Sequence, residues 1–232
     1  NRGITSKSGG ADVLEELGVR IDLPVEDLRR CVLKEGAGFL FAPLYHPAFK
    51  AVVPVRQELA KEGIRTVFNL IGPLLNPVRP EYQLVGVFDE KLTTTFAEIL
   101  GKLGRKKAWA VHGKGPNNEG MDEMSHCSET IVSEWNQDKV NQTSFKPEDF
   151  GLTACNLADL RGGDPKENAS IITSIFNNED QGPKRDIVAL NAAAGFVISG
   201  IADDIGHGLE IALRTITDGI AMTKLNSLRE FK

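Results

Sequence analysis

The feature that most constrains the fold of this chain is an alternation of short apolar runs with amphipathic segments. Residues 83–88 and 108–112 have the pattern of strands, and residues 92–103 between them have the pattern of a helix. A helix between two strands favours a parallel arrangement of those strands. A further apolar run at residues 39–42 is typical of a buried strand. The sequence therefore predicts an α/β fold with a mostly parallel central sheet flanked by helices.

Further helices are predicted before this alternation begins. Residues 11–17 have the pattern of a helix that ends at Gly18. A second helix is expected to begin at Pro24 and to end at Gly36, because proline suits the first helical position and glycine the position after the last. A third helix is predicted to follow His46 and to end near residue 61.

The second half of the chain is predicted to contain a β-hairpin and a helical C-terminal third. Residues 130–135 and 140–145 are strand-like and are separated by polar residues. One apolar face is expected in the C-terminal third, formed by Leu209, Ala212, Leu213, Ile216 and Ile220. Because no repeat or linker divides the sequence, residues 1–232 are predicted to form one α/β domain.

Composition and charge restrict the class of protein. The chain has 27 Lys and Arg against 32 Asp and Glu, a net charge of −5, which argues against sequence-independent binding of nucleic acid. The three cysteines include no CxxC pair, so neither a disulfide framework nor a zinc site is indicated. No signal-peptide pattern opens the given sequence, and no apolar run in it approaches membrane-spanning length. We therefore expect a cytoplasmic protein, or an organellar one if a transit peptide was removed, with no membrane partner.

The first twelve residues, NRGITSKSGGAD, combine hydroxyl side chains, glycines and two basic residues ahead of a predicted helix. Glycines allow backbone N–H groups to approach a ligand closely, and hydroxyls donate hydrogen bonds, so phosphate or pyrophosphate is the natural guest. The alternative is an ordinary helix cap, which has the same composition.

A second candidate site is the acidic pair Asp122-Glu123, which follows a predicted strand and a polar loop. Two carboxylates at the carboxyl edge of a sheet suit Mg²⁺, which prefers oxygen ligands and often bridges to a substrate phosphate. An isolated acidic pair is more often a solvated loop.

A third candidate is Arg56, whose guanidinium could bind a carboxylate or phosphate with two hydrogen bonds. The alternative is an exposed helical arginine. His46 and His112 are equally open to a structural interpretation. Taken together, the three candidates indicate a phosphate-bearing substrate, a divalent ion and an acidic second substrate.

Several motifs in order along the chain resemble those of anthranilate phosphoribosyltransferase, an enzyme of tryptophan biosynthesis. The blocks are NR at residues 1–2, SKSGGADVLE at 6–15, FLFAP at 39–43, HP at 46–47, VR at 55–56, RTVFNLIGPLLNP at 65–77, GMDE at 120–123, DFG at 149–151 and NAA at 191–193. The resemblance extends over essentially the whole chain. It implies a fold like that of the nucleoside phosphorylases and phosphoribosyltransferases.

The resemblance implies a reaction and its ligands. A phosphoribosyl group is transferred from phosphoribosyl pyrophosphate to anthranilate, which yields N-(5-phosphoribosyl)anthranilate and pyrophosphate, with Mg²⁺ as cofactor. No strong general base is expected, because the arylamine is neutral at pH 7. The family has upstream Gly-Thr-Gly-Gly-Asp and Lys-His-Gly-Asn motifs and a small helical N-terminal domain. The resemblance implies that these elements lie outside this chain and that the intact enzyme is a homodimer through that domain.

The resemblance also assigns site residues. It places anthranilate at Asn1, Arg56 and Pro73, and Mg²⁺ at Asp122 and Glu123. It places phosphoribosyl pyrophosphate at Asn1, Arg2, Gly3, Thr5, Ser6 and Gly10. Two alternatives remain open: a non-catalytic nucleic-acid-binding paralogue of the same fold, and a relative of the nucleoside phosphorylases.

Overall fold

A computed structural model describes most of the chain and divides it into two compact units. The described residues are 8–46, 52, 55, 58–59, 61–64, 66–67 and 70–232. Unit 1 comprises Asn1–Ile71, Gly162–Glu179 and Ile216–Lys232, and unit 2 comprises Gly72–Arg161 and Asp180–Thr215. That residues 1–232 act as one catalytic domain remains a prediction. Within the described ranges, no helix is long and apolar enough to cross a membrane.

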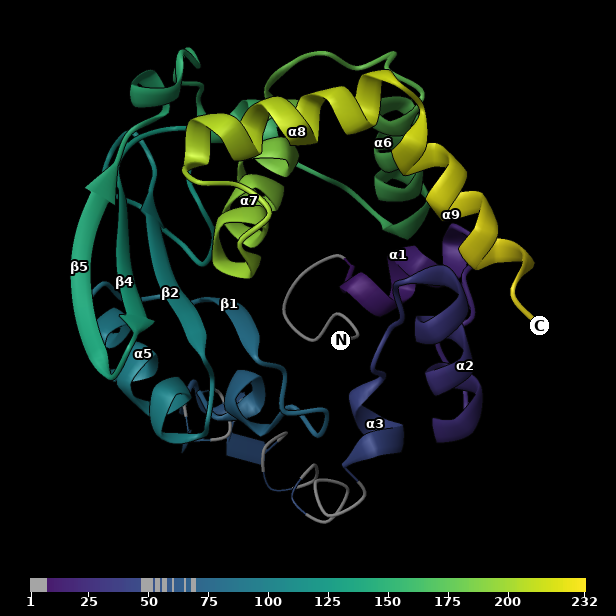
Figure 1. The fold of residues 1–232 in the computed structure, drawn as a ribbon, viewed down its shortest axis with the longest axis horizontal. Coiled ribbons are helices and arrows are strands. Elements are labelled where there is room, and N and C mark those ends of the chain that lie inside the picture. Colours follow the sequence, from purple (N-terminus) through teal and green to yellow (C-terminus); the bar gives the residue numbers. More distant parts are fainter. Residues whose placement is uncertain are drawn as a thin grey trace. The chain divides into compact units, whose positions relative to one another are not determined.

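Unit 2 is built on a five-stranded sheet (Figure 1). Its strands are β1 (Tyr82–Gly86), β2 (Lys107–Lys114), β3 (Gly120–Met121), β4 (Thr130–Asn136) and β5 (Lys139–Phe145). The order is β1-β2-β4-β5, with β3 also paired to β2. Strands β1 and β2 are parallel, whereas β2 pairs with β3 and β4, and β4 with β5, in antiparallel fashion.

The α/β architecture with a central sheet flanked by helices is confirmed, but the prediction of a mostly parallel sheet is wrong for the described strands. Only the connection from β1 to β2 contains a crossover helix, α5 (Leu92–Lys102), and a parallel pair needs such a crossover. The predicted hairpin is confirmed as β4 and β5. Gln137 and Asp138 take φ angles of 50° and 60° in its turn, as two-residue hairpin turns of type I′ require.

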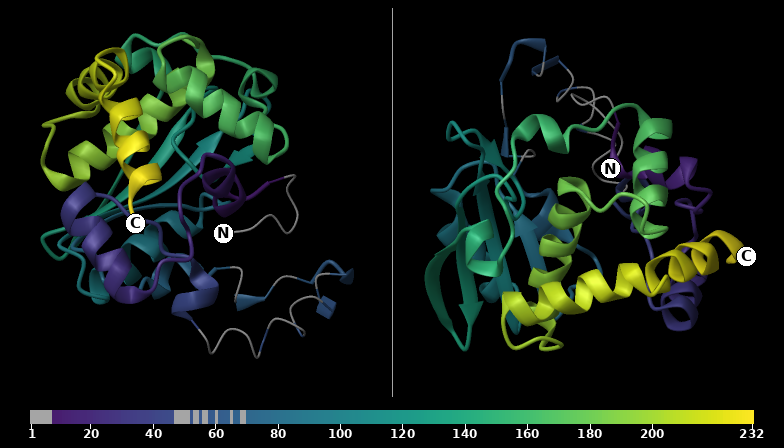
Figure 2. Two further views of the ribbon diagram at one scale, coloured as in Figure 1. Left: turned by 90° about the vertical axis from the view of Figure 1, so that its right-hand side faces the viewer. Right: turned by 90° about the horizontal axis from the view of Figure 1, so that it is seen from above.

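Two helices cover opposite faces of this sheet (Figures 1 and 2). Helix α5 lies on the face of Ser133, whose Oγ donates to Thr93 Oγ1 at 2.9 Å. Helix α7 (Pro183–Ser199) lies on the other face, where Lys107 Nζ donates to the Val197 carbonyl at 3.3 Å. Strand side chains alternate between faces, so the two sets of contacts do not compete.

The sheet core is tightly packed because small residues face α5. Ala108 and Ala110 on β2 are fully buried, as are Ala97 and Leu100 on α5. Gly101 of α5 sits against the half-buried ring of Trp135, where an added Cβ would lie 2.0 Å from Trp135 Cε2. The helix can therefore approach the sheet only because this position has no side chain.

Unit 1 is helical in its described part. It contains α1 (Gly10–Glu16), α2 (Val25–Glu35), α3 (Ala42–Tyr45), α6 (Pro165–Phe176) and α9 (Ile220–Glu230). One buried cluster joins α1, α6 and α9 through Val13, Ala169 and Leu225. A second joins Leu28 of α2 to Phe231, just beyond α9. Segments far apart in sequence therefore share the core of this unit.

The remaining described elements are three short 3-10 helices and helix α8, which contains residues of both units. They are η3 (Gly72–Leu75), η4 (Pro147–Phe150), η5 (Leu157–Leu160) and α8 (Ile205–Thr217). Leu209, Ala212 and Ile216 of α8 are buried, as predicted. Ile220 is 55 % exposed and belongs to α9, so its assignment to the same apolar face is wrong.

Most predicted helices are confirmed, and one predicted strand is wrong. Helices α1 and α2 occupy the predicted ranges, and Gly36 ends α2 with a φ of 75°. The run at residues 39–42 pairs with none of the described strands, and α3 begins at Ala42. Pro43 accounts for this, because its fixed φ and missing N–H suit a first helical turn. The helix predicted for residues 47–61 lies mainly outside the described residues.

Gly101→Ala tests the packing of α5 on the sheet. The added methyl group conflicts with the Trp135 ring, so we expect a loss of about 1–3 kcal/mol in the free energy of unfolding, measured by urea denaturation. Gly195→Ala on α7 is the matched control, because its Cβ would meet nothing within 4 Å. The control should be neutral or stabilising by up to about 1 kcal/mol. Equal stability of the two variants would contradict the packing argument.

Candidate active site

The acidic pair Asp122-Glu123 lies beside the carboxyl ends of β1 and β2. Strand β3 leads into the pair and is held by antiparallel pairing of Gly113 with Met121 and of Lys114 with Gly120. In open α/β sheets, ligands bind outside the carboxyl ends of the parallel strands. The pair therefore stands at the edge of the sheet where a substrate is expected.

Two glycines allow the acidic segment to press against the strand ends. A Cβ added to Gly86 would lie 1.5 Å from the Asp122 carbonyl oxygen, and one added to Gly113 would lie 2.5 Å from that of Glu123. No side chain fits in either place. The backbone of the acidic pair is thus fixed by direct contact with β1 and β2, which holds the two neighbouring carboxylates at this edge of the sheet.

The two carboxylates are not neutralised by neighbouring cations. Both residues are exposed. Neither forms an ion pair with any lysine, arginine or histidine in the part of the chain that the structure describes. Lost hydration beside the surrounding protein, and then the charge of Asp122, raise the pKa of the Glu123 carboxyl. The pair therefore favours a cation.

The donor set fits Mg²⁺ as a bridging ion. Among the described residues, no group of three or more His, Cys, Asp or Glu side chains is arranged to hold a metal ion. Mg²⁺ commonly takes only one or two carboxylates and completes its octahedron with water and substrate phosphate. Asp122 and Glu123 supply that number of ligands.

The backbone after the acidic pair is anchored to α7. Met124 N donates to Asn191 Oδ1 at 2.9 Å, and Asn191 Nδ2 donates to the Met124 carbonyl at 3.1 Å. Ser125 Oγ donates to the Lys114 carbonyl at 2.7 Å and accepts from Cys127 N. Asn191 thus satisfies both backbone groups of the residue next to the acids. The NAA motif pointed to Asn191, but its role follows only from the fold.

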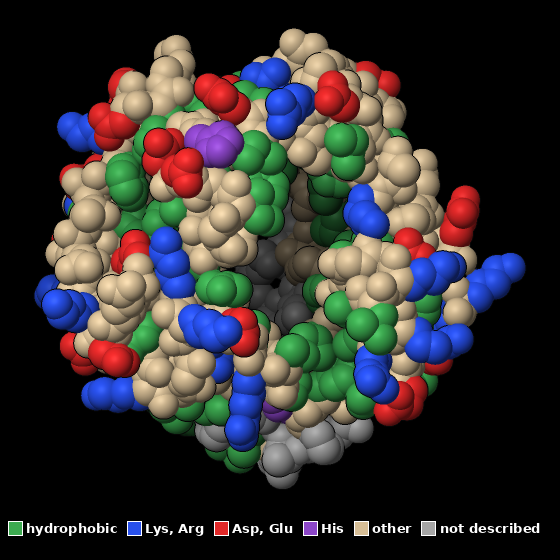
Figure 3. All heavy atoms as spheres, in the orientation of Figure 1, with side chains coloured by type: hydrophobic (Ala, Val, Ile, Leu, Met, Phe, Trp, Pro, Cys, Tyr) green, Lys and Arg blue, Asp and Glu red, His purple; other side chains and the backbone are tan. Residues whose placement is uncertain are grey.

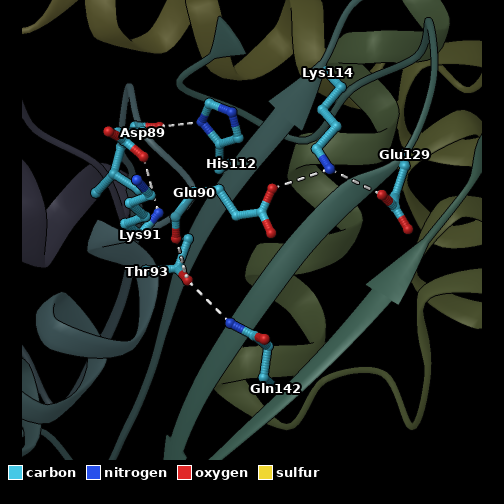
Figure 4. A network of polar contacts seen from close by, with 9 residues as sticks. Asp89, Glu90, Lys91, Thr93, His112, Lys114, Glu129 and Gln142 are labelled. Atoms are coloured by element: carbon cyan, nitrogen blue, oxygen red, sulfur yellow. Dashed lines mark hydrogen bonds and ion pairs between the residues drawn. The ribbon is translucent and has the colours of Figure 1, made fainter. Parts of the chain in front are cut away.

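A network of charged groups braces the same sheet edge (Figure 4). Lys114 Nζ lies 3.0 Å from Glu90 Oε2 and 3.1 Å from Glu129 Oε2, which joins the loop after β1 to β2 and β4. These contacts, the one with Glu90 first, raise the pKa of Lys114, and Lys114 lowers that of Glu129. Sequence reasoning missed this network, because the three residues are far apart in the chain. Lys114 therefore has a structural role, in which it pairs with Glu90 and Glu129.

His112 also has a structural position. It is buried, and its Nδ1 lies 2.8 Å from the Val87 carbonyl oxygen. This contact links β2 to the residue just after β1, and it supports the structural alternative for His112. His46 is half-buried at the end of α3.

The other predicted site residues are only partly described. Asn1, Arg2, Gly3, Thr5, Ser6 and Arg56 lie outside the described residues. Gly10 is exposed at the start of α1 in unit 1, with nothing within 4 Å of an added Cβ. Nearby, Asn168 Nδ2 donates to Ser8 Oγ at 2.7 Å, so this hydroxyl is held by α6.

Pro73 is exposed in η3 of unit 2. Its carbonyl oxygen accepts a hydrogen bond from Gln83 Nε2 at 2.8 Å. This bond fixes the backbone of the predicted anthranilate residue to β1. Of the predicted residues, the structure brings Pro73, Asp122 and Glu123 into unit 2.

A comparison with protein families matches a range of the chain that includes the sheet, the acidic pair and the glycine-rich start. A family model described as "Glycosyl transferase family, a/b domain" matches residues 1–222. The chain belongs to this glycosyl transferase family.

Curated relatives from this family are similar over the whole chain. Anthranilate phosphoribosyltransferase from Thermoanaerobacter sp. (strain X514) is 46 % identical over 232 residues, and the chain covers 66 % of it. The enzyme of the same name from Methanosarcina acetivorans is 45 % identical over 231 residues, with 60 % covered. The chain therefore spans just under two thirds of the length of these relatives.

Solved structures give the same result. Anthranilate phosphoribosyltransferase (TrpD) from Thermus thermophilus has a TM-score of 0.91 and 38 % identity, covering 100 % of this chain and 66 % of its own. The Saccharomyces cerevisiae enzyme in complex with PRPP and Mg has a TM-score of 0.83 and 26 % identity, covering 95 % and 61 %. The predicted family resemblance is confirmed.

Replacing Lys114 by Gln tests the ion-pair network. The lowered pKa of Glu129 means that its contribution to stability is present above its unfolded pKa of about 4.3 and is lost as pH falls through the folded value. The raised pKa of Lys114 means that its contribution is lost as pH rises through the folded value, above about 10.4.

The stability difference between wild type and Lys114→Gln should therefore be largest between about pH 5 and pH 10 and should shrink toward pH 3. Because both carboxylates are partly exposed, we expect a difference of about 1 kcal/mol at most. Urea denaturation across this pH range measures it. A difference that stays constant from pH 7 to pH 3 would contradict the ion-pair assignment.

Proposed function

We propose that this chain carries the α/β part of an anthranilate phosphoribosyltransferase. The reaction transfers a phosphoribosyl group from phosphoribosyl pyrophosphate to the amine of anthranilate, yielding N-(5-phosphoribosyl)anthranilate and pyrophosphate, in tryptophan biosynthesis. The observation that carries this proposal is the uncompensated pair Asp122-Glu123, held against the ends of β1 and β2. The identity of 46 % to a relative of that name supports it.

Related structures support the ligands. The yeast relative was solved in complex with PRPP and Mg, and again in complex with 4-fluoroanthranilate. We propose the same substrates and Mg²⁺ for this protein. Asp122 and Glu123 would hold Mg²⁺, which when bound supplies charge neutralisation for a pyrophosphate leaving group.

The chain's own residues contribute mainly positioning. Asn191 and Ser125 fix the backbone next to the acids, so the carboxylates need little reorganisation before the pyrophosphate develops charge. The amine of anthranilate is already neutral at pH 7, so no side chain is proposed as a general base. Alignment of the amine with the ribose carbon would supply most of the remaining rate enhancement.

The substrate contacts are proposed from family resemblance. Anthranilate would lie at Asn1, Arg56 and Pro73, and phosphoribosyl pyrophosphate at Asn1, Arg2, Gly3, Thr5, Ser6 and Gly10. Arg56 would bind the anthranilate carboxylate with two hydrogen bonds. A cytoplasmic homodimer, formed through a helical N-terminal domain, is likewise a proposal.

No observation favours the alternative of a nucleic-acid-binding paralogue. Lys and Arg side chains are interspersed with Asp and Glu over the face shown in Figure 3. Nucleic-acid binding needs a continuous basic surface, and the net charge of the chain is −5. We therefore retain the transferase as the single proposed function.

The double variant Asp122→Asn with Glu123→Gln tests the metal role. In the full-length protein we expect kcat/KM to fall by about 100-fold or more, since stabilisation of the leaving group is lost. Loss of anthranilate fluorescence in the presence of phosphoribosyl pyrophosphate and Mg²⁺ measures the rate. Circular dichroism should show an unchanged fold.

The matched control is Glu26→Gln with Asp27→Asn, an adjacent acidic pair in the first turn of α2. It removes the same charge and should leave activity unchanged. Wild-type kinetics in the Asp122 and Glu123 variant would remove these residues from the mechanism.

Arg56→Ala tests the carboxylate contact. Loss of a charge-assisted bidentate pair is worth about 1.5–3 kcal/mol, so KM for anthranilate should rise about 10- to 100-fold. KM for phosphoribosyl pyrophosphate should change little. Steady-state titration of each substrate distinguishes the two, and Arg56→Lys should restore part of the loss. Equal effects on both substrates would exclude this role.

A further inference from the structure

A cavity of about 700 Å³ lies near the start of β1 in unit 2. Three cationic residues line it: Arg79 from the loop before β1, Lys102 at the end of α5, and Arg105 in the segment after α5. Gln83 near the start of β1 contacts Arg105, whereas Gly86 at the other end contacts Asp122. Gln83 and Gly86 are three residues apart, which is about 10 Å along a strand that rises about 3.3 Å per residue. The cavity is therefore separate from the acidic pair.

The positive charge of this cavity is not compensated. The described residues that line it include no Asp or Glu. Within the described part of the chain, none of the three cations forms an ion pair. Burial, and then the charge of Arg79, lower the pKa of the Arg105 guanidinium. Two guanidinium groups therefore line one cavity and repel each other, with no carboxylate among its described lining residues.

Arg105 is fixed in place although its charge is unpaired. It is only 4 % exposed. Its Nε donates to Gln83 Oε1 at 2.8 Å and its Nη1 to the Leu103 carbonyl at 3.0 Å, both of which are neutral acceptors. Burying a charge without a counter-charge is unfavourable, and an incoming anion would offset that cost.

The C-terminus of α5 explains only part of this cluster. Cations are favourable near a helix C-terminus, which accounts for Lys102. Three of the last four carbonyls of α5 are already satisfied, however, because Leu103 N, Gly104 N and Arg105 N donate to Ile99, Gly101 and Leu100. Arg79 belongs to a different segment, so the helix dipole does not explain why it converges on the same cavity.

We infer that this cavity binds a small anion that carries one or two phosphate groups. Guanidinium groups bind phosphate oxygens in pairs, and three cations match the charge of such a ligand. The apolar side chains of Leu74, Leu75 and Leu103 lie in the same lining and offer room for an organic part. This inference goes beyond the proposed reaction and does not depend on it.

The probe is inorganic pyrophosphate in a buffer that contains EDTA. Isothermal titration calorimetry measures its binding. EDTA removes the divalent ion that binding at Asp122-Glu123 would need. We expect saturable binding to wild type, weakened about tenfold or more in the variant Arg79→Gln with Lys102→Gln. Both side chains are exposed, so this variant should fold, as circular dichroism can verify. Arg105→Gln should have the same effect.

Lys34→Gln is the charge-matched control for the single variant Arg105→Gln, because Lys34 is exposed on α2 in unit 1. It should leave binding unchanged. No saturable binding in EDTA, or equal weakening in the Lys34 variant, would overturn the inference. Tighter binding of a single-stranded oligonucleotide than of pyrophosphate would overturn the assignment to a small ligand.

The acidic-pair variant separates this inference from the proposed function. Asp122→Asn with Glu123→Gln should keep the EDTA-resistant binding and lose only the Mg²⁺-dependent binding. Loss of the EDTA-resistant binding in this variant would place the anion at the acidic pair and overturn the second site. If the proposed function is wrong, the wild-type protein should instead show no Mg²⁺-dependent binding of pyrophosphate.

Discussion

The candidate site depends on the direct contact between the acidic segment and two glycines. Gly86 and Gly113 leave no space for a side chain beneath the carbonyl groups of Asp122 and Glu123. Since the backbone is held there, the two neighbouring carboxylates stay at the strand ends, where lost hydration first and then the charge of Asp122 raise the pKa of Glu123. The hydrogen bonds from Asn191 to Met124 hold the next residue and complete the support.

Unpaired charge distinguishes sites from scaffold in this structure. Lys114 lies within 3.1 Å of two carboxylates and is therefore part of the framework. Asp122 and Glu123 have no such partner among the described residues, and neither do Arg79 and Arg105 at the other end of β1. Gln83 connects Arg105 to the segment of Pro73, because it accepts from Arg105 and donates to the Pro73 carbonyl. An anion near Arg105 would thus be two hydrogen bonds from the proposed anthranilate segment.

Predictions based on local pattern were the most accurate. Helices α1, α2 and α5 and the hairpin of β4 and β5 are determined by neighbouring residues, through apolar periodicity and turn chemistry. The strand predicted at residues 39–42 was wrong because an apolar run of four residues does not distinguish strand from coil, and Pro43 favoured a helical turn. Strand direction was also wrong, since it is set by pairing between distant segments.

The sequence by itself determined the family, the adjacency of Asp122 and Glu123, and the helices and the hairpin that follow local patterns, because each is written in neighbouring residues. Only the tertiary structure decided which groups would meet. Asn191 lies 67 residues from Met124, and Arg105 lies 22 residues from Gln83. Such contacts have no local signature, because they arise only when the sheet pairs and the helices pack on it.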